Sequence, residues 1–189
     1  MKKTKILLPI ICILLFIIIS FYKKDMVFSC NTKNQETILQ KVGTINKNIE
    51  NFKMIEKDIH GIPSEGTNVK FYYNKDTNDL VFVDVSSFAT IARYFTKYYI
   101  ENNSIFFIDS TTDEWDLKKL YGEKGELSAS EGTFVVGVSS KEQYIVLQNK
   151  LCKYISEKPW IESAAVTKSN PEKDLAGLLE MYQFLLSSK

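Results

Sequence analysis

The chain has 189 residues, of which 44% are hydrophobic and 25% are charged. This balance is typical of one globular domain and excludes a disordered or collagen-like chain. The 24 basic and 23 acidic side chains give a formal charge of only +1, so the overall charge does not indicate a nucleic-acid partner. The charge is unevenly spread, because residues 1–24 hold five lysines and no acid, which leaves a net charge of −4 on the rest.

An apolar run of 17 residues, 6–22, lies between lysines near the N-terminus. As a helix it would be about 26 Å long, the low end for spanning a bilayer. A cleavable signal peptide needs small residues before the cut, and the best position, after Ser20, has Ile18 at minus three. A lipoprotein signal ending at Cys30 is a further alternative, but Phe28 does not fit its motif. We therefore expect an uncleaved signal anchor that places the body outside the cytoplasm, facing the periplasm or the cell surface.

The exported body would then contain two of the three cysteines, Cys30 and Cys152. Because an oxidising compartment permits disulfides, these two could close one long loop. The alternative is two unrelated thiols, since Cys152 falls on the apolar side of a predicted helix, where buried free cysteines are common.

An amphipathic helix is predicted to follow Cys30. Its apolar residues, spaced alternately four and three apart, are Ile38, Val42, Ile45, Ile49 and Phe52. The stripe continues to Ile59 and ends before the breaker at 60–63. The same spacing would let two copies of the chain pair as a coiled coil, but fewer than three heptads are present, so packing onto the protein's own sheet is favoured. The chain thus divides into an anchor (1–24), a juxtamembrane helix and linker (25–67) and the remaining domain (68–189).

From residue 68 onward the apolar period changes to two, which predicts strands. Four runs, at 68–73, 80–85, 90–100 and 104–109, are predicted to form an antiparallel meander. The run at 90–100 could also be a helix, because Ile91, Tyr94, Phe95 and Tyr98 are spaced three and four apart, but its β-branched and aromatic content favours a strand. Residues 110–132 are polar and contain glycines, so we expect a loop or a ragged hairpin there, and 133–138 is a further strand.

Two helices are predicted at the C-terminal end. The first begins at a capping box, either Ser139 with Glu142 or Ser140 with Gln143, and its apolar stripe holds Tyr144, Leu147, Leu151 and Tyr154. A short strand at 160–167 precedes the second helix, which begins at Asn170 and Pro171 in the expected order of cap and proline. The predicted fold class is therefore α+β: a transmembrane helix, one amphipathic helix, an antiparallel β-meander and two C-terminal helices, with the helices on one face of the sheet.

Residues that usually carry catalysis are scarce. The chain has one histidine, His60, whose place at a predicted helix end indicates a capping role rather than a general base. It has no glycine-rich phosphate loop, no cysteine-pair zinc site and no nucleophile elbow. The spacing of Asp109 and Asp113 does not match a calcium loop. The sequence predicts no catalytic residue, no metal and no cofactor.

An acidic patch around Trp115 is the main candidate binding site. Its carboxylates are Asp109, Asp113, Glu114 and Asp116. An exposed tryptophan ringed by carboxylates would suit a basic protein partner. A solvated loop, or a tryptophan that closes the core, is the structural alternative.

Aromatic residues are the other unusual feature, with ten tyrosines and twelve phenylalanines. The two rings of an aromatic doublet in a strand point to opposite faces, so one ring of each pair faces outward. The outward set is predicted to include Tyr72, Tyr94, Tyr98 and Phe106. These rings could bind a protein, a sugar or a peptidoglycan fragment, although burial under the helices is favoured. Arg93, the only arginine, is expected to pair with an acid or stack on a ring, or else to anchor an anionic ligand.

Together these features predict a non-catalytic binding protein, anchored in the membrane, whose partner is another protein. One concrete form is an immunity or inhibitor protein that neutralises a toxin or hydrolase in the envelope. One alternative is a structural subunit of an envelope assembly that oligomerises through the amphipathic helix. The other is an envelope hydrolase that uses carboxylates such as Asp109 or Asp113.

Overall fold

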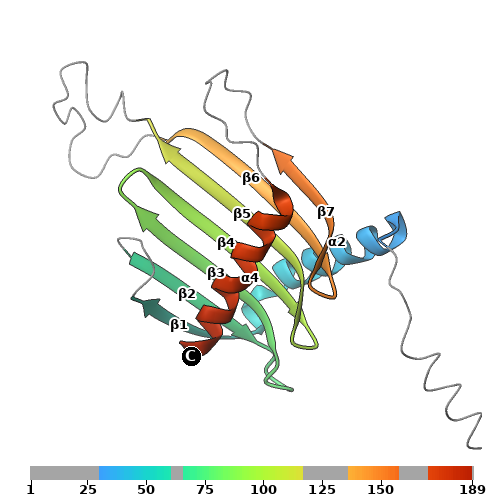
Figure 1. Ribbon diagram of the computed structural model, residues 1–189. Coiled ribbons are helices and arrows are strands. Elements are labelled where there is room, and N and C mark those ends of the chain that lie inside the picture. The colour runs from blue at the N-terminus through green and yellow to red at the C-terminus, as the bar shows by residue number, and fades with distance from the viewer. Residues whose placement is uncertain (1–29, 61–65, 117–135, 158–169, 189) are drawn as a thin grey trace, which may run out of the picture.

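The computed structural model describes residues 30–60, 66–116, 136–157 and 170–188 (Figure 1). These residues form one seven-stranded antiparallel sheet in which each strand pairs with the next along the chain, in the order β1 to β7. One helix precedes the sheet and one follows it, and the two lie on opposite faces (Figure 1).

The elements have the following bounds. They are α2 (Thr32–Lys47), the 3₁₀ helix η1 (Ile49–Asn51), β1 (Lys53–Ile59), β2 (Gly66–Tyr73), β3 (Leu80–Ala89), β4 (Ala92–Glu101), β5 (Ser104–Trp115), β6 (Val136–Leu147), β7 (Lys150–Glu157) and α4 (Pro171–Ser187).

Local signals explain where the helices begin and where two of the hairpins turn. The Asn31 side chain accepts a hydrogen bond from the backbone N–H of Asn34 at the start of α2, and Asn170 caps α4 in the same way. The β4–β5 and β6–β7 hairpins turn through residue pairs 102–103 and 148–149, all four with φ between 51° and 61°. Two consecutive positive φ angles are the geometry of the tight turn that matches the twist of paired strands.

The sheet has a hydrophobic core on each side. On one side the buried residues of α4, including Leu175, Tyr182 and Leu185, pack against a broad set of strand residues centred on Tyr98 and Tyr144. On the other side Ile38 of α2 packs on Phe82, Tyr99, Phe107 and Ile145, with Val42, Ile45 and Ile49 around them. Most of the apolar stripe of α2 is therefore used within the protein's own core, so in this structure those side chains do not face a second copy.

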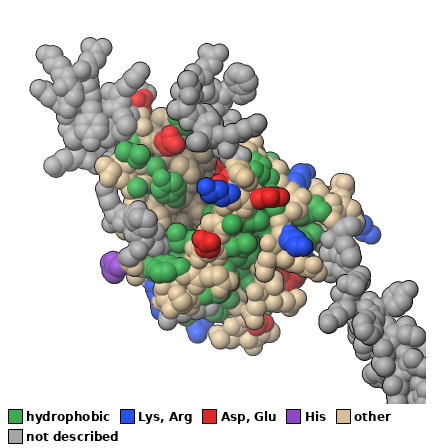
Figure 2. All heavy atoms as spheres, in the orientation of Figure 1, with side chains coloured by type: hydrophobic (Ala, Val, Ile, Leu, Met, Phe, Trp, Pro, Cys, Tyr) green, Lys and Arg blue, Asp and Glu red, His purple; other side chains and the backbone are tan. Residues whose placement is uncertain are grey.

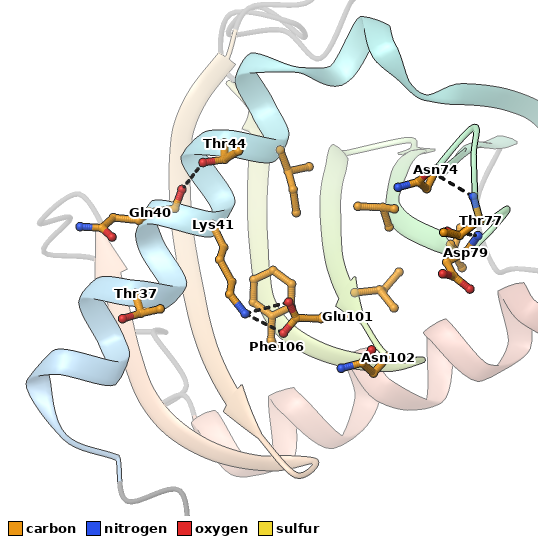
Figure 3. Close-up of a pocket in the computed structure, with 14 residues that line it drawn as sticks. Thr37, Gln40, Lys41, Thr44, Asn74, Thr77, Asp79, Glu101, Asn102 and Phe106 are labelled. Atoms are coloured by element: carbon orange, nitrogen blue, oxygen red, sulfur yellow. Dashed lines mark hydrogen bonds and ion pairs between the residues drawn. The ribbon is translucent and has the colours of Figure 1, made fainter.

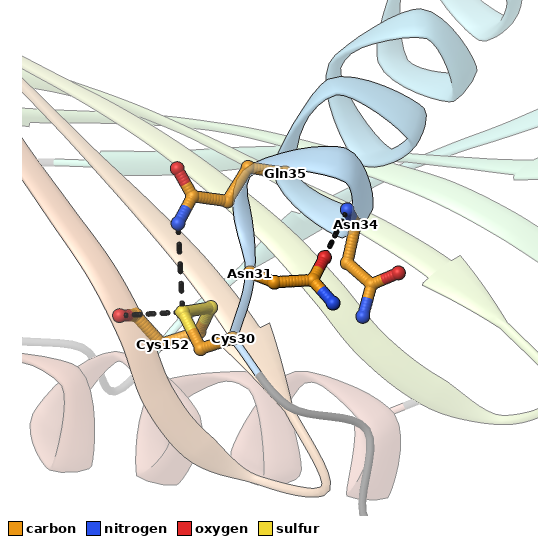
Figure 4. Close-up of a disulfide and its surroundings, with 5 residues drawn as sticks. All are labelled: Cys30, Asn31, Asn34, Gln35 and Cys152. Atoms are coloured by element: carbon orange, nitrogen blue, oxygen red, sulfur yellow. Dashed lines mark hydrogen bonds between the residues drawn. A yellow bond between two sulfur atoms is a disulfide. The ribbon is translucent and has the colours of Figure 1, made fainter.

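A disulfide joins Cys30, just before α2, to Cys152 in β7 (Figure 4). The side-chain amide of Gln35, in the first turn of α2, approaches the Cys30 sulfur at 3.7 Å. The bond therefore holds the start of α2 against the last strand of the sheet. A lipid thioether would need the same sulfur, so this structure does not support a lipoprotein at Cys30.

The predicted fold class is wrong in its helices. Residues 139–157, expected to be a helix, form the β6–β7 hairpin, because three consecutive residues, Tyr144, Ile145 and Val146, are buried in a strand covered on both faces. The first helix ends at Lys47 rather than near Ile59, and the remaining residues form η1 and β1. The two helices cover opposite faces, not one. Residues 110–115, expected in a loop, continue β5, while the strand predicted at 160–167 lies outside the described residues.

The predicted membrane anchor is also corrected. Among the described segments of the chain, no helix is long and apolar enough to span a bilayer. This finding contradicts a single-pass signal-anchor protein and the membrane-anchored, extracytoplasmic localisation that followed from it. The apolar run at 6–22, on which that expectation depended, lies outside the described residues.

Candidate functional site

The α2 side of the sheet is covered unevenly. Partners in adjacent antiparallel strands point to the same side, so the register places side chains in rows across the sheet. The row that includes Tyr99 and Phe107 lies under α2. The next three rows, toward the β3–β4 turn, are largely polar, and we call them the charged face. Its members are Lys70, Asp84, Lys97, Asp109 and Gln143 in the first row, Asn68, Ser86, Phe95, Thr111 and Lys141 in the second, and Phe88, Arg93, Asp113 and Ser139 in the third.

Charges of opposite sign alternate along the first row. With Glu56 of β1 the sequence of charges across five strands is acid, base, acid, base, acid. At one end Lys70 Nζ lies 3.9 Å from Glu56 Oε1. At the other end Asp109 is 3.6 Å from Lys141 Nζ and accepts a long hydrogen bond of 3.5 Å from the Gln143 amide. Opposite charges on neighbouring strands stabilise the sheet, whereas like charges there would destabilise it.

A hollow of about 490 Å³ opens in the middle of the charged face. It is lined by Asp84, Ser86, Phe95, Lys97, Asp109, Thr111 and Lys141. Burial raises the pKa of the Asp84 carboxyl, and the nearby charges of Lys97 and Lys70 oppose that rise. The hollow therefore combines two acids, two bases, two hydroxyl groups and one aromatic ring.

Next to the hollow, Arg93 is held between two aromatic rings. Its guanidinium carbon lies 5.3 Å from the Phe95 ring centroid and 5.4 Å from that of Trp115. Arg93 Nε donates a hydrogen bond of 2.8 Å to one oxygen of Asp113, and Ser139 Oγ donates one of 2.6 Å to the other. The Ser139 hydrogen bond and the Arg93 contact lower the pKa of Asp113, while burial opposes them. We call Arg93, Phe95, Asp113 and Trp115 the arginine cluster.

Exposed apolar side chains surround this end of the sheet. Phe88, directly opposite Arg93 in the register, is 45% exposed, and Ile91 in the β3–β4 turn is 58% exposed. The backbone N–H of Trp115 donates to the carbonyl of Ile91 at 2.9 Å, which joins this turn to the end of β5. Figure 2 looks onto the opposite, α4 side, where acidic and basic side chains are interspersed among hydrophobic ones.

The structure brings some of the predicted binding residues together and separates others. Arg93, Asp109, Asp113 and Trp115 all lie on the α2 side of β4 and β5. Tyr72 lies on the same side, with its ring 5.1 Å from that of Phe82.

Three predicted residues point to the α4 side instead. Tyr94 and Glu114 reach the surface there, but Tyr98 is fully buried and donates a hydrogen bond of 3.1 Å to the Leu178 carbonyl of α4. Asp116 follows β5 and lies over Gly137, where an added Cβ would come within 3.0 Å of the Asp116 Cα. The carboxylates therefore do not ring Trp115 in a loop, because strand alternation sends them to both sides of the sheet.

A second hollow of about 520 Å³ lies between α2 and the β2–β3 and β4–β5 turns (Figure 3). Lys41 of α2 crosses it to Glu101, with Nζ 2.7 Å from the nearer carboxylate oxygen, and lies 6.0 Å from the Phe106 ring centroid. The amide side chains at its rim are Gln40, Asn74 and Asn102. Its one base, Lys41, is thus already paired with Glu101, and Asp79 is the remaining charged residue that lines this hollow.

The sequence did not predict that Asp84, Lys97 and Lys141 line one hollow. Their alternation within strands is visible in the sequence, but only the register shows that three strands place them around one hollow. His60 is exposed and directly follows strand β1, not a helix as predicted. In the described ranges, no group of three or more His, Cys, Asp or Glu residues is arranged to hold a metal ion.

Comparisons with protein-family models, with curated proteins and with solved structures found no match to this chain. The function must therefore be inferred from the side chains of the charged face and its surroundings.

Proposed function

We propose that the protein is a non-catalytic binding protein and that its partner is another protein, which docks on the arginine cluster and the exposed residues beside it. The observation that carries this proposal is the fixed position of Arg93 between Phe95 and Trp115, next to exposed Phe88. Arginine and large aromatic residues dominate the binding energy of protein interfaces, and lysine, although abundant on surfaces, contributes less often.

The cluster is organised before any partner arrives. Asp113 holds Arg93 through Nε, and Ser139 holds Asp113, so the guanidinium and its two rings need little further ordering on binding. A contact that is already ordered loses less conformational entropy when a complex forms. The guanidinium stays partly exposed, with 37% of the Arg93 side chain accessible, and can still donate to a partner.

An inhibitor or immunity protein that neutralises a toxin or a hydrolase is one concrete form of this proposal. Such a protein works by covering its target and needs no catalytic residues of its own. A surface with alternating charges favours a specific partner, because a wrong partner places like charges against one another.

The proposal is tested by site-specific photo-crosslinking in cells that produce the protein. A benzophenone amino acid replaces Phe88, and a matched control replaces Phe184, which is 41% exposed on α4 at the other side of the sheet. We expect one protein to be captured at position 88 and not at position 184. Mass spectrometry identifies it.

The captured protein is then purified and its affinity for the full chain is measured by calorimetry. We expect Phe88→Asp to weaken binding at least tenfold, because it removes an exposed aromatic ring and places a carboxylate beside Arg93 that competes with the partner for the guanidinium, while Phe184→Asp leaves the affinity unchanged. Equal capture at both positions, or a purified complex insensitive to Phe88→Asp, would show that the arginine cluster is not the docking surface.

A further inference from the structure

Four polar side chains that line the hollow on the charged face have no side-chain partner among the described residues. Asp84, Ser86, Lys97 and Thr111 all line it, and none makes a side-chain hydrogen bond or ion pair with the described residues. Elsewhere on the same face Arg93, Asp113 and Ser139 are joined to one another, and Asp109 is joined to Lys141. On the opposite side of the sheet even small hydroxyls pair, as Thr67 does with Ser87 at 2.9 Å.

Asp84 and Lys97 are the centre of this group. They are direct neighbours in the β3–β4 register, which places their Cβ atoms about 5 Å apart. They influence each other electrostatically but form no ion pair. One negative and one positive group thus stand side by side at the floor of a hollow, and each can accept a partner of opposite charge.

The environment of Asp84 agrees with this geometry. Burial is the largest influence on the carboxyl and raises its pKa, and this half-buried group accepts no side-chain hydrogen bond from the described residues. A carboxylate in that position gains more from a bound cation than one that is already paired or fully hydrated.

We propose that the hollow binds a small zwitterion of the α-amino acid type, with its ammonium group on Asp84 and its carboxylate on Lys97. The hydroxyl groups of Ser86 and Thr111 lie in the next row and can hydrogen-bond to the same two groups. Phe95 lines the hollow beside them and offers an apolar surface to the side chain of the ligand. The volume of about 490 Å³ falls within the range of small-molecule sites.

A zwitterion fits better than a simple ion. The hollow has two acids and two bases, so a cation alone would be repelled by Lys97 and Lys141, and an anion alone by Asp84 and Asp109. A ligand that carries both charges a few ångströms apart can satisfy one of each. This site goes beyond the proposed function, since it needs no protein partner.

Three matched probes test the idea on the full wild-type chain by NMR titration. They are leucine, which has both charges, leucinamide, which has only the ammonium group, and N-acetylleucine, which has only the carboxylate. We expect leucine to shift the amide signals of β3, β4 and β5 around the hollow, with an affinity at least tenfold above that of either analogue. Equal binding of the three probes, or no saturable shift with leucine up to about 10 mM, would overturn the proposal.

Two variants test whether Asp84 and Lys97 bind the charged groups of leucine. Asp84→Asn and Lys97→Gln should each weaken leucine binding at least tenfold, while Lys75→Gln, in the exposed β2–β3 turn, should leave it unchanged. A spectrum that retains the dispersed signals of the wild type shows that each variant is folded. Retained leucine affinity in both hollow variants would place the bound probe elsewhere. Because the probes are free amino acids, this result does not depend on whether the protein partner exists.

Discussion

At the scale of single residues, Asp113 shows how one buried carboxylate organises a surface. Only 8% of Asp113 is exposed, and both of its oxygens are engaged, one by Arg93 and one by Ser139. An ion pair on an open surface contributes little to stability, but a carboxylate in this position would be costly without its donors. The same contacts that stabilise Asp113 keep the Arg93 guanidinium between Phe95 and Trp115.

Replacing this carboxylate should reduce stability in a pH-dependent way. We expect Asp113→Asn to lower the free energy of unfolding by about 1–3 kcal/mol at neutral pH, because the amide weakens two hydrogen bonds to a charged group. The folded pKa of Asp113 lies below its unfolded value of about 3.9. The stabilisation is therefore fully present above the unfolded pKa and is lost as the pH falls through the folded pKa.

Urea unfolding of the wild type and the variant at a series of pH values measures this difference. It should shrink between about pH 5 and pH 2. Asp76→Asn, on the exposed β2–β3 turn, is the matched control and should show almost no difference at any pH. If the difference in free energy of unfolding between the wild type and Asp113→Asn stays constant as the pH falls, the ionised form of Asp113 is not what stabilises the fold.

At the scale of whole elements, local signals decided what the sequence could predict. The start of α4 is correctly predicted, because Asn170 and Pro171 specify it without reference to the rest of the chain. The β6–β7 hairpin is not correctly predicted, because a strand buried on both faces does not alternate between apolar and polar residues. The spacing of Leu147, Leu151 and Tyr154 also matches a helical stripe by coincidence.

In the candidate site, too, contacts between nearby residues could be predicted and those that depend on the whole sheet could not. The sequence predicts that Arg93 pairs with an acid or stacks on a ring, and it does both, with partners on its own and the adjacent strand. The hollow beside Asp84 could not be predicted, because it depends on the register of four neighbouring strands, β3 to β6, at once. Register is set by the packing of both faces of the sheet, and no single segment contains that information.

The β6–β7 turn leads to a prediction at this scale. Gln148 has φ 52°, a left-handed conformation that costs most residues about 1 kcal/mol or more and that asparagine tolerates better. We expect Gln148→Asn to raise the free energy of unfolding by about 0.5–1 kcal/mol.

The reverse change in the neighbouring hairpin is the matched comparison. Asn102 occupies the equivalent first turn position of β4–β5 with φ 51°, so Asn102→Gln should destabilise the protein by a similar amount. Chemical unfolding of both variants checks the pair. No stabilisation by Gln148→Asn, or no destabilisation by Asn102→Gln, would mean that side-chain contacts outweigh backbone conformation in these turns.

At the scale of the whole molecule, one sheet separates two cores of different extent. The α4 core includes residues from β1 to β7, whereas the α2 core is centred on four buried strand residues and leaves the charged face beyond it. The helix that covers less of the sheet is the one fixed to it by a covalent bond, between Cys30 and Cys152. Loss of α2 would expose Phe82, Tyr99 and Phe107, so the attachment of this helix matters for solubility as well as for stability.

Removal of the disulfide should therefore loosen α2 before it affects the rest of the fold. The two cysteines are 122 residues apart, and in the chain-entropy model closure of so long a loop stabilises the folded state by about 5 kcal/mol. We expect the double variant Cys30→Ser and Cys152→Ser to lose stability on that order. Hydrogen exchange locates the effect: amides of α2 should exchange much faster in the double variant, while those of α4 keep more of their protection. Equal acceleration in both helices would instead show that α2 and α4 open together, and that the bond stabilises the sheet as one cooperative unit rather than the attachment of one helix.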